Sequence, residues 1–353
     1  MKRVVSLLLC LMMVASLTAC GGEKTTETSS NDGATKTETT DIVTGMIAYS
    51  FGTQSFSDDV LAGLVKAEEE LQIPHYELEI ADVTETASGF RTLIQQGVNF
   101  VVATTAEYCD GMLEVANEYP DVCFLYLAEY LEDAPENVIS FEYRENEAAF
   151  LAGALGALLT GNNKIGAVLA VTDPIQLRYQ YGYMAGAKAI NPECEVMVTF
   201  TNSYADTNIG YEHASAMYSQ GCDYVGYYAG ACNLGVFQAA EEAGAEKYCF
   251  GAANGQFDKC HDKIVASVVK PIDEAIVALL RDGLENGKFD TSISSLGLKE
   301  GGVKLLFTDN QELLSMVGDE NMAIIDDLKE KIVSGELIVP ATEEEWNSFD
   351  YTY

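Results

Sequence analysis

The amino-acid sequence predicts an α/β protein built from two similar lobes, and the first observation behind this is an internal duplication. Residues 220–240, QGCDYVGYYAGACNLGVFQAA, align without a gap with residues 96–116, QGVNFVVATTAEYCDGMLEVA, which lie 124 positions earlier. Each copy has the pattern of a helix end, a Gln-Gly turn, a short buried strand, a loop and a second helix. A chain that carries this unit twice is long enough for two lobes of ordinary domain size.

The second observation is the alternation of short apolar runs with segments of helical periodicity, a pattern typical of parallel α/β sheets. We expect strands at residues 44–49, 76–80, 122–128, 165–171, 195–200, 224–228, 248–252 and 264–269. The apolar helix expected at 147–160 is too short to span a bilayer and should pack in the core. Loops at the carboxyl ends of strands form the ligand site in open α/β sheets, so two lobes facing each other through these loops would clamp a ligand.

The N-terminal 20 residues read as an export signal, with a basic start, an apolar run and small residues before Cys20. The sequence LTAC at residues 17–20 is similar to the bacterial lipobox, which implies that Cys20 becomes the lipid-modified first residue of the mature protein. An ordinary cleaved signal is the alternative. Residues 21–41 are almost entirely polar and are expected to be a flexible tether. This arrangement predicts a lipid-anchored protein at the extracytoplasmic face of the cell membrane.

The order of the expected elements divides the folded part into two discontinuous lobes. Residues 42–142 and 264–298 are assigned to lobe 1, and residues 143–263 and 299–345 to lobe 2. The chain is expected to cross between the lobes near residues 139–143, 264–269 and 297–306. A helix is expected at residues 319–334, after the third crossing. Three such crossings make a hinge whose strands bend together. The acidic and aromatic tail, residues 346–353, is expected to be a strap on the surface.

Composition excludes several classes of function. The formal net charge of −35 argues against general affinity for nucleic acid or for an anionic membrane surface. The three histidines are widely spaced in no zinc-ligand pattern, so neither a metal nor another cofactor is expected. The cysteines beyond the leader form no CxxC pair and are interpreted as free thiols in apolar strands. Ser203 and Cys232 could be proposed as nucleophiles, but no histidine or acid partner is visible for either, so an enzyme is not expected.

Eight motifs in order resemble one family over residues 42–340. They are SFSDDVLAGL, ANEYPDVCF, ENEAAFLAGALGALLT, RYQYGYMAGAKAINP, SYADTNIGYEHASAMYSQGCDYVGYYAG, GVFQAAEEAG, IVASVVKPID and IVSGELIVP. The chain resembles the basic membrane protein (BMP) family of bacterial ABC-transporter substrate-binding lipoproteins, whose best-known members bind purine nucleosides. The resemblance implies a type I periplasmic-binding-protein fold, two doubly wound α/β lobes joined by three crossovers, with the ligand between them. It also implies delivery of that ligand to an ABC permease driven by a separate ATPase.

The resemblance also suggests residues that would hold the ligand. Phe56 matches the family phenylalanine that stacks on the ligand ring, although it could instead pack on the following helix. Lys270 matches a family lysine that donates to a ligand hydroxyl or carbonyl group, and a lysine after the apolar run IVASVV should have a partner. Asp110 aligns with an acidic position that can accept from a purine N–H, or it could serve the start of a helix. Tyr204 and Tyr228 lie at strand ends of lobe 2 and supply a second ring face or core packing.

The chain departs from the family where the family binds ribose. The first-loop Asp and Asn of the family are Thr53 and Ser57 here, and Ser57 is also expected to be the N-cap of the following helix. Ala253 and Gly255 replace the two acids of a strand-end motif. The polar candidates that remain in this motif are Asn254 and Gln256. A buried hydroxyl that lacks a partner costs on the order of 1–3 kcal/mol, or one to two decades of affinity. The sequence therefore leaves open a nucleobase, a flavin-like ring or another small solute, and also a surface sensor or adhesin that performs no transport.

Overall fold

The computed structural model describes residues 42–49, 51–52, 56–204, 206–252, 256–289 and 295–353. The export signal, Cys20 and the expected tether lie outside the described residues. Within the described ranges, no helix combines the length and the apolar character that a membrane span requires.

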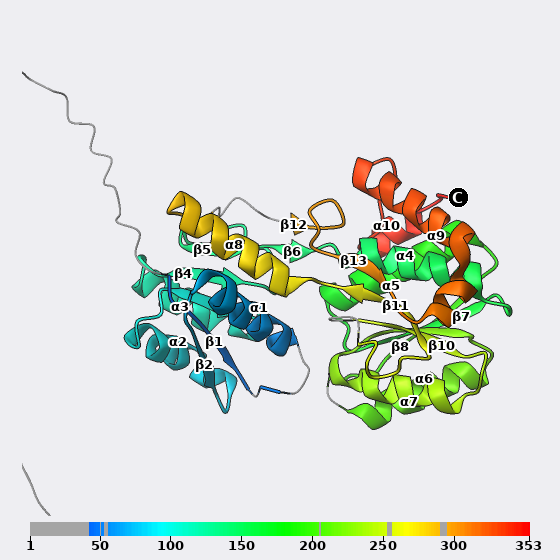
Figure 1. Ribbon diagram of the computed structural model, residues 1–353, viewed down its shortest axis with the longest axis horizontal. Helices are drawn as coiled ribbons and strands as arrows, with labels where there is room; N and C mark the ends of the chain where they lie inside the picture. The colour runs from blue at the N-terminus through cyan, green and yellow to red at the C-terminus, as the bar shows by residue number, and fades with distance from the viewer. Residues whose placement is uncertain (1–41, 50, 53–55, 205, 253–255, 290–294) are drawn as a thin grey trace, which may run out of the picture. The chain divides into compact units, whose positions relative to one another are not determined.

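The first lobe contains a parallel five-stranded sheet with the order β2-β1-β3-β4-β5. Its strands are β1 (Thr44–Ala48), β2 (His75–Glu79), β3 (Phe100–Ala103), β4 (Cys123–Tyr126) and β5 (Val138–Ser140). Helices α1 (Phe56–Leu71) and α8 (Ile272–Asn286) pack against each other on one face of this sheet. Helices α2 (Thr86–Gln95) and α3 (Cys109–Glu118) cover the other face (Figure 1). Short 3-10 turns, η1 (Val83–Glu85) and η2 (Ala106–Tyr108), precede α2 and α3.

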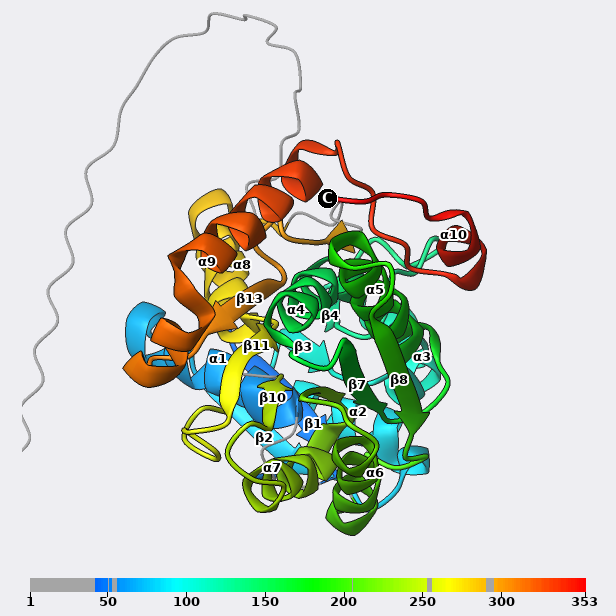
Figure 2. The same ribbon diagram turned by 90° about the vertical axis from the view of Figure 1, so that its right-hand side faces the viewer.

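The second lobe contains a six-stranded sheet with the order β13-β11-β10-β9-β7-β8. Its strands are β7 (Lys164–Leu169), β8 (Glu195–Phe200), β9 (Tyr224–Tyr228), β10 (Tyr248–Gly251), β11 (Ile264–Val269) and the antiparallel β13 (Lys304–Phe307). Figure 2 shows α4 (Glu145–Leu159), α5 (Pro174–Ile190) and α9 (Gln311–Ser334) on one face. The turn η3 (Gly230–Cys232) and helices α6 (Thr207–Ser219) and α7 (Asn233–Glu242) belong to the other face. The central strand β9 is buried along its whole length, as expected for a strand covered on both faces.

The duplication predicted from the sequence is confirmed in the backbone. The turn and helix formed by η2 and α3 recur as η3 and α7 at the same offset in residue number. The glycines of the two Gln-Gly turns, Gly97 and Gly221, both have φ of +100°, a conformation that favours glycine. The two copies therefore share their turn geometry as well as their sequence pattern.

The chain passes between the two sheets at three places. After β5, the short strand β6 (Glu142–Tyr143) pairs in parallel with β12 (Ser295–Leu296), so the first and third crossings lie side by side. The second crossing differs from the expected one. Strand β11 bonds to β10 and β13 of the second sheet, and the chain returns to the first lobe only with α8, after β11 rather than before it. The run IVASVV is buried at every residue. Burial of this kind requires neighbours on both faces but does not say in which sheet they lie.

Two further expectations need adjustment. Helix α1 begins at Phe56, so Ser57 lies in its first turn and is not its N-cap. Helix α9 begins at Gln311, well before the expected start at 319, and is kinked at Gly318, where φ is 75°. Helix α10 (Glu343–Ser348) leads into the tail. The tail lies against the second lobe, as expected of a strap, and Lys188 Nζ donates to the carbonyl of Phe349 at 2.6 Å. Figure 2 shows α10 beside α5.

Candidate ligand-binding site

The candidate site is built around Lys270, the residue that follows β11 at the second crossing. Its Nζ lies 2.8 Å from Oε1 of Glu145, the first residue of α4. The Glu145 side chain is only 1% exposed and that of Lys270 is 18% exposed. The expectation that Lys270 has a partner is therefore confirmed, and that partner is a buried carboxylate.

Three aromatic rings surround the Lys270 ammonium. Nζ lies 5.3 Å from the ring centroid of Phe56, 4.9 Å from that of Tyr143 and 5.9 Å from that of Tyr179. These distances are typical of cation–π contacts, which strengthen as the cation loses water. Phe56 comes from α1 of the first lobe, Tyr143 from β6 in a crossing, and Tyr179 from α5 of the second lobe. Rings from both lobes therefore meet at one lysine in the hinge.

Glu145 also binds a second cation. Arg178 Nε, in α5, lies 2.6 Å from Oε2 of Glu145, while Lys270 occupies Oε1. A further carboxylate, Glu142, lies 3.6 Å from Arg178 Nη1 and is 44% exposed. A carboxylate as deeply buried as Glu145 remains charged in a protein only when such partners compensate for its lost hydration.

Tyr228 packs against Tyr179, one of the rings around Lys270. Its ring stacks on that of Tyr179, with centroids 4.4 Å apart and an interplanar angle of 16°. Tyr228 is 4% exposed and also meets Tyr183 edge to face. Of the two roles expected for Tyr228, the described contacts match packing, through which it fixes the plane of the Tyr179 ring.

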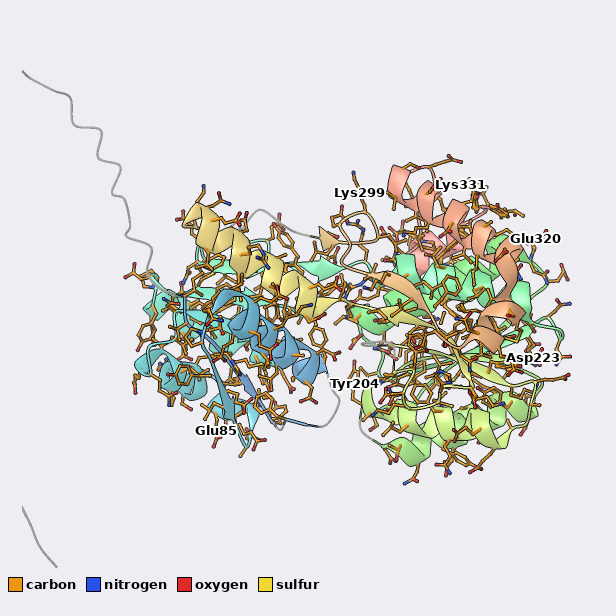
Figure 3. The ribbon with its side chains drawn as sticks, viewed as in Figure 1. Glu85, Tyr204, Asp223, Lys299, Glu320 and Lys331 are labelled. Atoms are coloured by element: carbon orange, nitrogen blue, oxygen red, sulfur yellow. The ribbon has the colours of Figure 1, made fainter. Side chains whose placement is uncertain are left out.

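Tyr204 lies at the same end of the second sheet as the start of α5. It is 46% exposed, and its hydroxyl donates to Oδ2 of Asp173 at 3.0 Å. Asp173 is the N-cap of α5, and its other oxygen accepts from the backbone N–H of Gln176. Figure 3 shows Tyr204 and Asp223 at opposite ends of the second sheet. The exposed face of Tyr204 is therefore available near the helix that carries Arg178 and Tyr179.

The other predicted site residues are more scattered. Ser57 Oγ lies 3.3 Å from Oγ1 of Thr104, which ties α1 to the carboxyl end of β3. Asp110 is exposed in the first turn of α3, where a helix dipole favours a carboxylate, and it forms no hydrogen bond or ion pair with the Lys270 group within the described residues. Gln256 has φ of 55°, and its buried Oε1 has no hydrogen-bond partner in the described part of the chain. Thr53 and Asn254 lie outside the described residues, as do Ala253 and Gly255.

Another carboxylate near Lys270 has an unusual pKa. The pKa of Asp59 is raised to about 7, first by burial and then by the charges of Asp58 and Asp273, whereas the charge of Lys270 acts in the opposite direction. Asp273 is itself paired with Lys66, at 3.1 Å, across the contact between α1 and α8. The first turn of α1 thus brings a titratable group to the same region as Phe56.

Sequence reasoning missed Tyr143, Glu145, Arg178 and Tyr179. The one signal available for Glu145 was its position at the start of an apolar helix, and this equally fits a residue that interacts with the helix dipole. Arg178 and Tyr179 lie in the motif RYQYGYMAGAKAINP, which gives no indication of what the side chains contact. The partners are far apart in sequence, so the ion pairs could not be predicted from local spacing.

Two α/β lobes with parallel sheets, joined by three crossings, define the type I periplasmic-binding-protein fold. A family model described as ABC transporter substrate-binding protein PnrA-like, named Bmp, matches residues 43–343. The chain belongs to this family.

Known proteins similar to this chain agree with that assignment. Basic membrane protein A of Borreliella burgdorferi is 28% identical over 309 residues, covering 86% of this chain and 89% of the relative. Basic membrane protein B of the same organism is 30% identical over 245 residues, covering 68% and 69%. A solute-binding protein of an ABC transporter system from Aeropyrum pernix has a TM-score of 0.75 at 24% identity, covering 87% of this chain and 96% of that structure. A second such protein, from Conexibacter woesei, has a TM-score of 0.71 at 23% identity, covering 85% and 99%. The two structures support the fold.

Proposed function

We propose that this protein is the lipid-anchored binding component of an ABC importer and that it closes on a small aromatic heterocycle, nucleoside-like in the first instance. The observation that carries the proposal is the convergence of Phe56 and Tyr179, one from each lobe, on the ammonium of Lys270. Flat rings suit flat ligands, because stacked aromatic pairs gain energy beyond the area that they bury. A hinge residue that touches both lobes is also well placed to respond to closure.

Lys270 gives the proposed site its polar contact. An ammonium has three N–H donors, and Glu145 accepts from one of them. The remaining donors can bind a hydroxyl or carbonyl oxygen of the ligand, while the ligand ring replaces the ammonium over Phe56. Binding then exchanges a cation–π contact for a stacked pair and a charge-assisted hydrogen bond.

The ligand class is broader than the nucleosides. Alanine and glycine at positions 253 and 255 cannot accept hydrogen bonds from ribose hydroxyls through their side chains, whereas aspartates in the family motif can. A nucleobase or a flavin-like ring, which needs fewer hydroxyl partners, fits the described residues as well as a nucleoside does.

Lipidation of Cys20 would anchor the protein at the extracytoplasmic face, and the ABC permease with its ATPase would receive the ligand. We infer no catalysis. Burial raises the pKa of the Cys232 thiol, one of the two nucleophiles considered above, so the thiolate that would attack is disfavoured.

Native mass spectrometry of the freshly isolated protein, followed by isothermal titration with the compound found, tests the proposal. We expect a purine or flavin-like compound in the wild type, and at least a tenfold loss of affinity in Phe56→Ala, because the variant loses the area that the ring buries as well as about 1 kcal/mol of stacking beyond that area. Tyr76→Ala, which removes a 42% exposed ring at the edge strand of the same lobe, is the control and should leave affinity unchanged. A copurified sugar or amino acid, with Phe56→Ala binding it normally, would refute the proposed ligand class.

A further inference from the structure

Arg178 has a hydrogen-bond donor that no described residue of the protein uses. Its Nη2 is buried and has no hydrogen-bond partner among the described residues. The other nitrogens are engaged, Nε with Glu145 at 2.6 Å and Nη1 with Glu142 at 3.6 Å. Leaving a donor of a charged group unpaired inside a protein is costly, so an unpaired one beside a ligand site indicates a partner that arrives with the ligand.

Arg178 lies next to the proposed site. Arg178 and Lys270 bind the two oxygens of the same carboxylate, Glu145, so the two cations flank one another. The ring centroid of Tyr179, the next residue on α5, lies 5.9 Å from Lys270 Nζ. The spare donors of Arg178 and Lys270 therefore lie beside the rings that would hold a flat ligand.

The charges around Arg178 indicate what kind of partner is missing. Lys270 and Arg178 are already matched by Glu145 and by the more exposed Glu142. Asp59 also interacts with Lys270 electrostatically, which adds negative charge when it is ionised. A further anion is thus not needed to balance the site. What the donors lack is a neutral acceptor, and a carbonyl oxygen on a ring supplies one without adding charge.

We propose that Arg178 is a further ligand-binding residue, that it donates from Nη2 to an exocyclic carbonyl oxygen, and that the site therefore selects oxo-substituted over amino-substituted heterocycles. The inference deepens the proposed function and rests on it, since it assigns the polar edge of the ring that Phe56 and Tyr179 would hold. An amino group at the same place would direct its own N–H donors at those of Arg178, which is unfavourable for both.

Paired ligands that differ at one substituent test this directly. We would titrate the wild type with hypoxanthine and adenine, with inosine and adenosine, and with riboflavin, which carries two ring carbonyls. Hypoxanthine and inosine should bind about 10- to 100-fold more tightly than their amino counterparts, as expected for one hydrogen bond to a charged donor. Equal affinity within both pairs, or a preference for adenine and adenosine, would overturn the inference while leaving ring binding intact.

The variant Arg178→Lys keeps a cation next to Glu145 but removes the planar guanidinium and its Nη2 donor. In this variant we expect the preference within each pair to fall to less than about threefold, with unchanged midpoints of thermal unfolding. Arg281→Lys is the matched control, because Arg281 is 48% exposed and pairs with Glu70 on the surface. It should retain the wild-type preference. An undiminished preference in Arg178→Lys would overturn the role of Arg178. If none of the five compounds binds the wild type, ring binding itself fails, and the inference falls with it.

Discussion

At the scale of single residues, Lys270 and Glu145 show how charged groups can be buried in the hinge. Each ion on its own would lose much of its hydration, and the effective penalty is several kcal/mol per ion. The carboxylate compensates by binding two cations, and the ammonium by binding one oxygen and lying near three rings. The arrangement fixes where the ammonium and guanidinium donors point.

The sequence identified part of this group and could not identify the rest. Phe56 and Lys270 were predicted from the family motifs, and the structure brings their side chains together at 5.3 Å. Glu145 and Arg178 were not predicted, because an ion pair between residues far apart in sequence depends on how the helices pack. Asp110 matched a family position equally well, yet in the described residues it does not join the group. A motif match thus gives residue types in order, whereas contact requires the fold.

Asp59 leads to a prediction about pH. Its pKa of about 7 in the folded protein lies above the ordinary value of 3.8, first because of burial and then because of Asp58 and Asp273. Between these two values the folded state keeps a proton that the unfolded chain releases, so the stability contributed by Asp59 is lost as pH rises through about 7. Asparagine resembles the protonated carboxyl group. We therefore expect Asp59→Asn to be more stable than the wild type at pH 7.5, by about 1–3 kcal/mol.

Urea unfolding at pH 5 and pH 7.5 measures this difference. The advantage of Asp59→Asn should shrink at pH 5, where the wild-type carboxyl group is itself protonated. Asp258→Asn, at a side chain that is 73% exposed, is the control and should show no pH-dependent gain. An advantage of the same size at both pH values would mean that the substitution acts through packing and not through the proton.

At the scale of elements, helices α4 and α5 of the second lobe pack in close contact. Three glycines allow this contact, because a Cβ atom at any of them would meet a backbone carbonyl oxygen of the other helix. The distances would be 2.0 Å from Gly153 to Tyr183, 2.2 Å from Gly182 to Asn146 and 1.9 Å from Gly186 to Phe150. The two backbones therefore touch directly. This contact matters for the site, since α4 carries Glu145 and α5 carries Arg178 and Tyr179.

Gly186→Ala should therefore be destabilising. The added methyl group meets backbone atoms that cannot move without separating the helices, and overpacking of this kind costs about 3 kcal/mol. Chemical denaturation measures the loss. Gly161→Ala is the matched control, because the nearest heavy atom to its Cβ is 3.9 Å away, and its free energy of unfolding should change by less than about 0.5 kcal/mol. If both variants were equally stable, α4 and α5 would not be in backbone contact.

The elements were predictable to different degrees. The strands β8, β9 and β11 have the expected bounds, because continuous apolar or alternating runs end at clear turn signals. The sheet to which β11 belongs was not predictable, since a strand that is buried at every residue has the same apolar sequence pattern in either lobe. The start of α9 was also missed, because Gly318 interrupts the helical pattern and the segment before it is continuous with the helix only through a kink.

At the scale of the whole molecule, the duplicated unit places side-chain hydrogen bonds at equivalent positions in the two lobes, at the amino ends of their sheets. Asn99 Oδ1 accepts from the backbone N–H of Val43 at 2.8 Å in the first lobe. Its counterpart, Asp223, accepts from Lys247 Nζ at 2.8 Å and from the backbone N–H groups of Gly161 and Asn162 in the second. These hydrogen bonds lie at the amino ends of the strands, away from the loops at the carboxyl ends. Each sheet can therefore remain rigid while the hinge bends.

Arg144, the residue after β6, joins two of the hinge crossings through ion pairs and hydrogen bonds. Its Nε lies 2.6 Å from Glu147, its Nη1 donates to Oγ of Ser295 at 2.9 Å, and its Nη2 pairs with Glu300. Its backbone N–H also donates to the carbonyl of Leu296 at 2.9 Å. One side chain thus joins the first crossing to the third, so the two crossings should bend as a unit when the lobes move.

Arg144→Met should uncouple these crossings without touching the proposed ligand contacts. Glu147 and Glu300 would lose their shared cation, the β6–β12 pairing would weaken, and the unliganded lobes would sample more arrangements. Because a smaller fraction of molecules would then be ready to close correctly, ligand affinity should fall about 3- to 10-fold, and small-angle scattering should give a larger radius of gyration without ligand. Arg91→Met is the matched control, because Arg91 also pairs with two carboxylates, Glu114 and Glu118, but only within the first lobe. If both variants matched the wild type in affinity and in radius of gyration, the crossings would bend together through their backbone pairing alone.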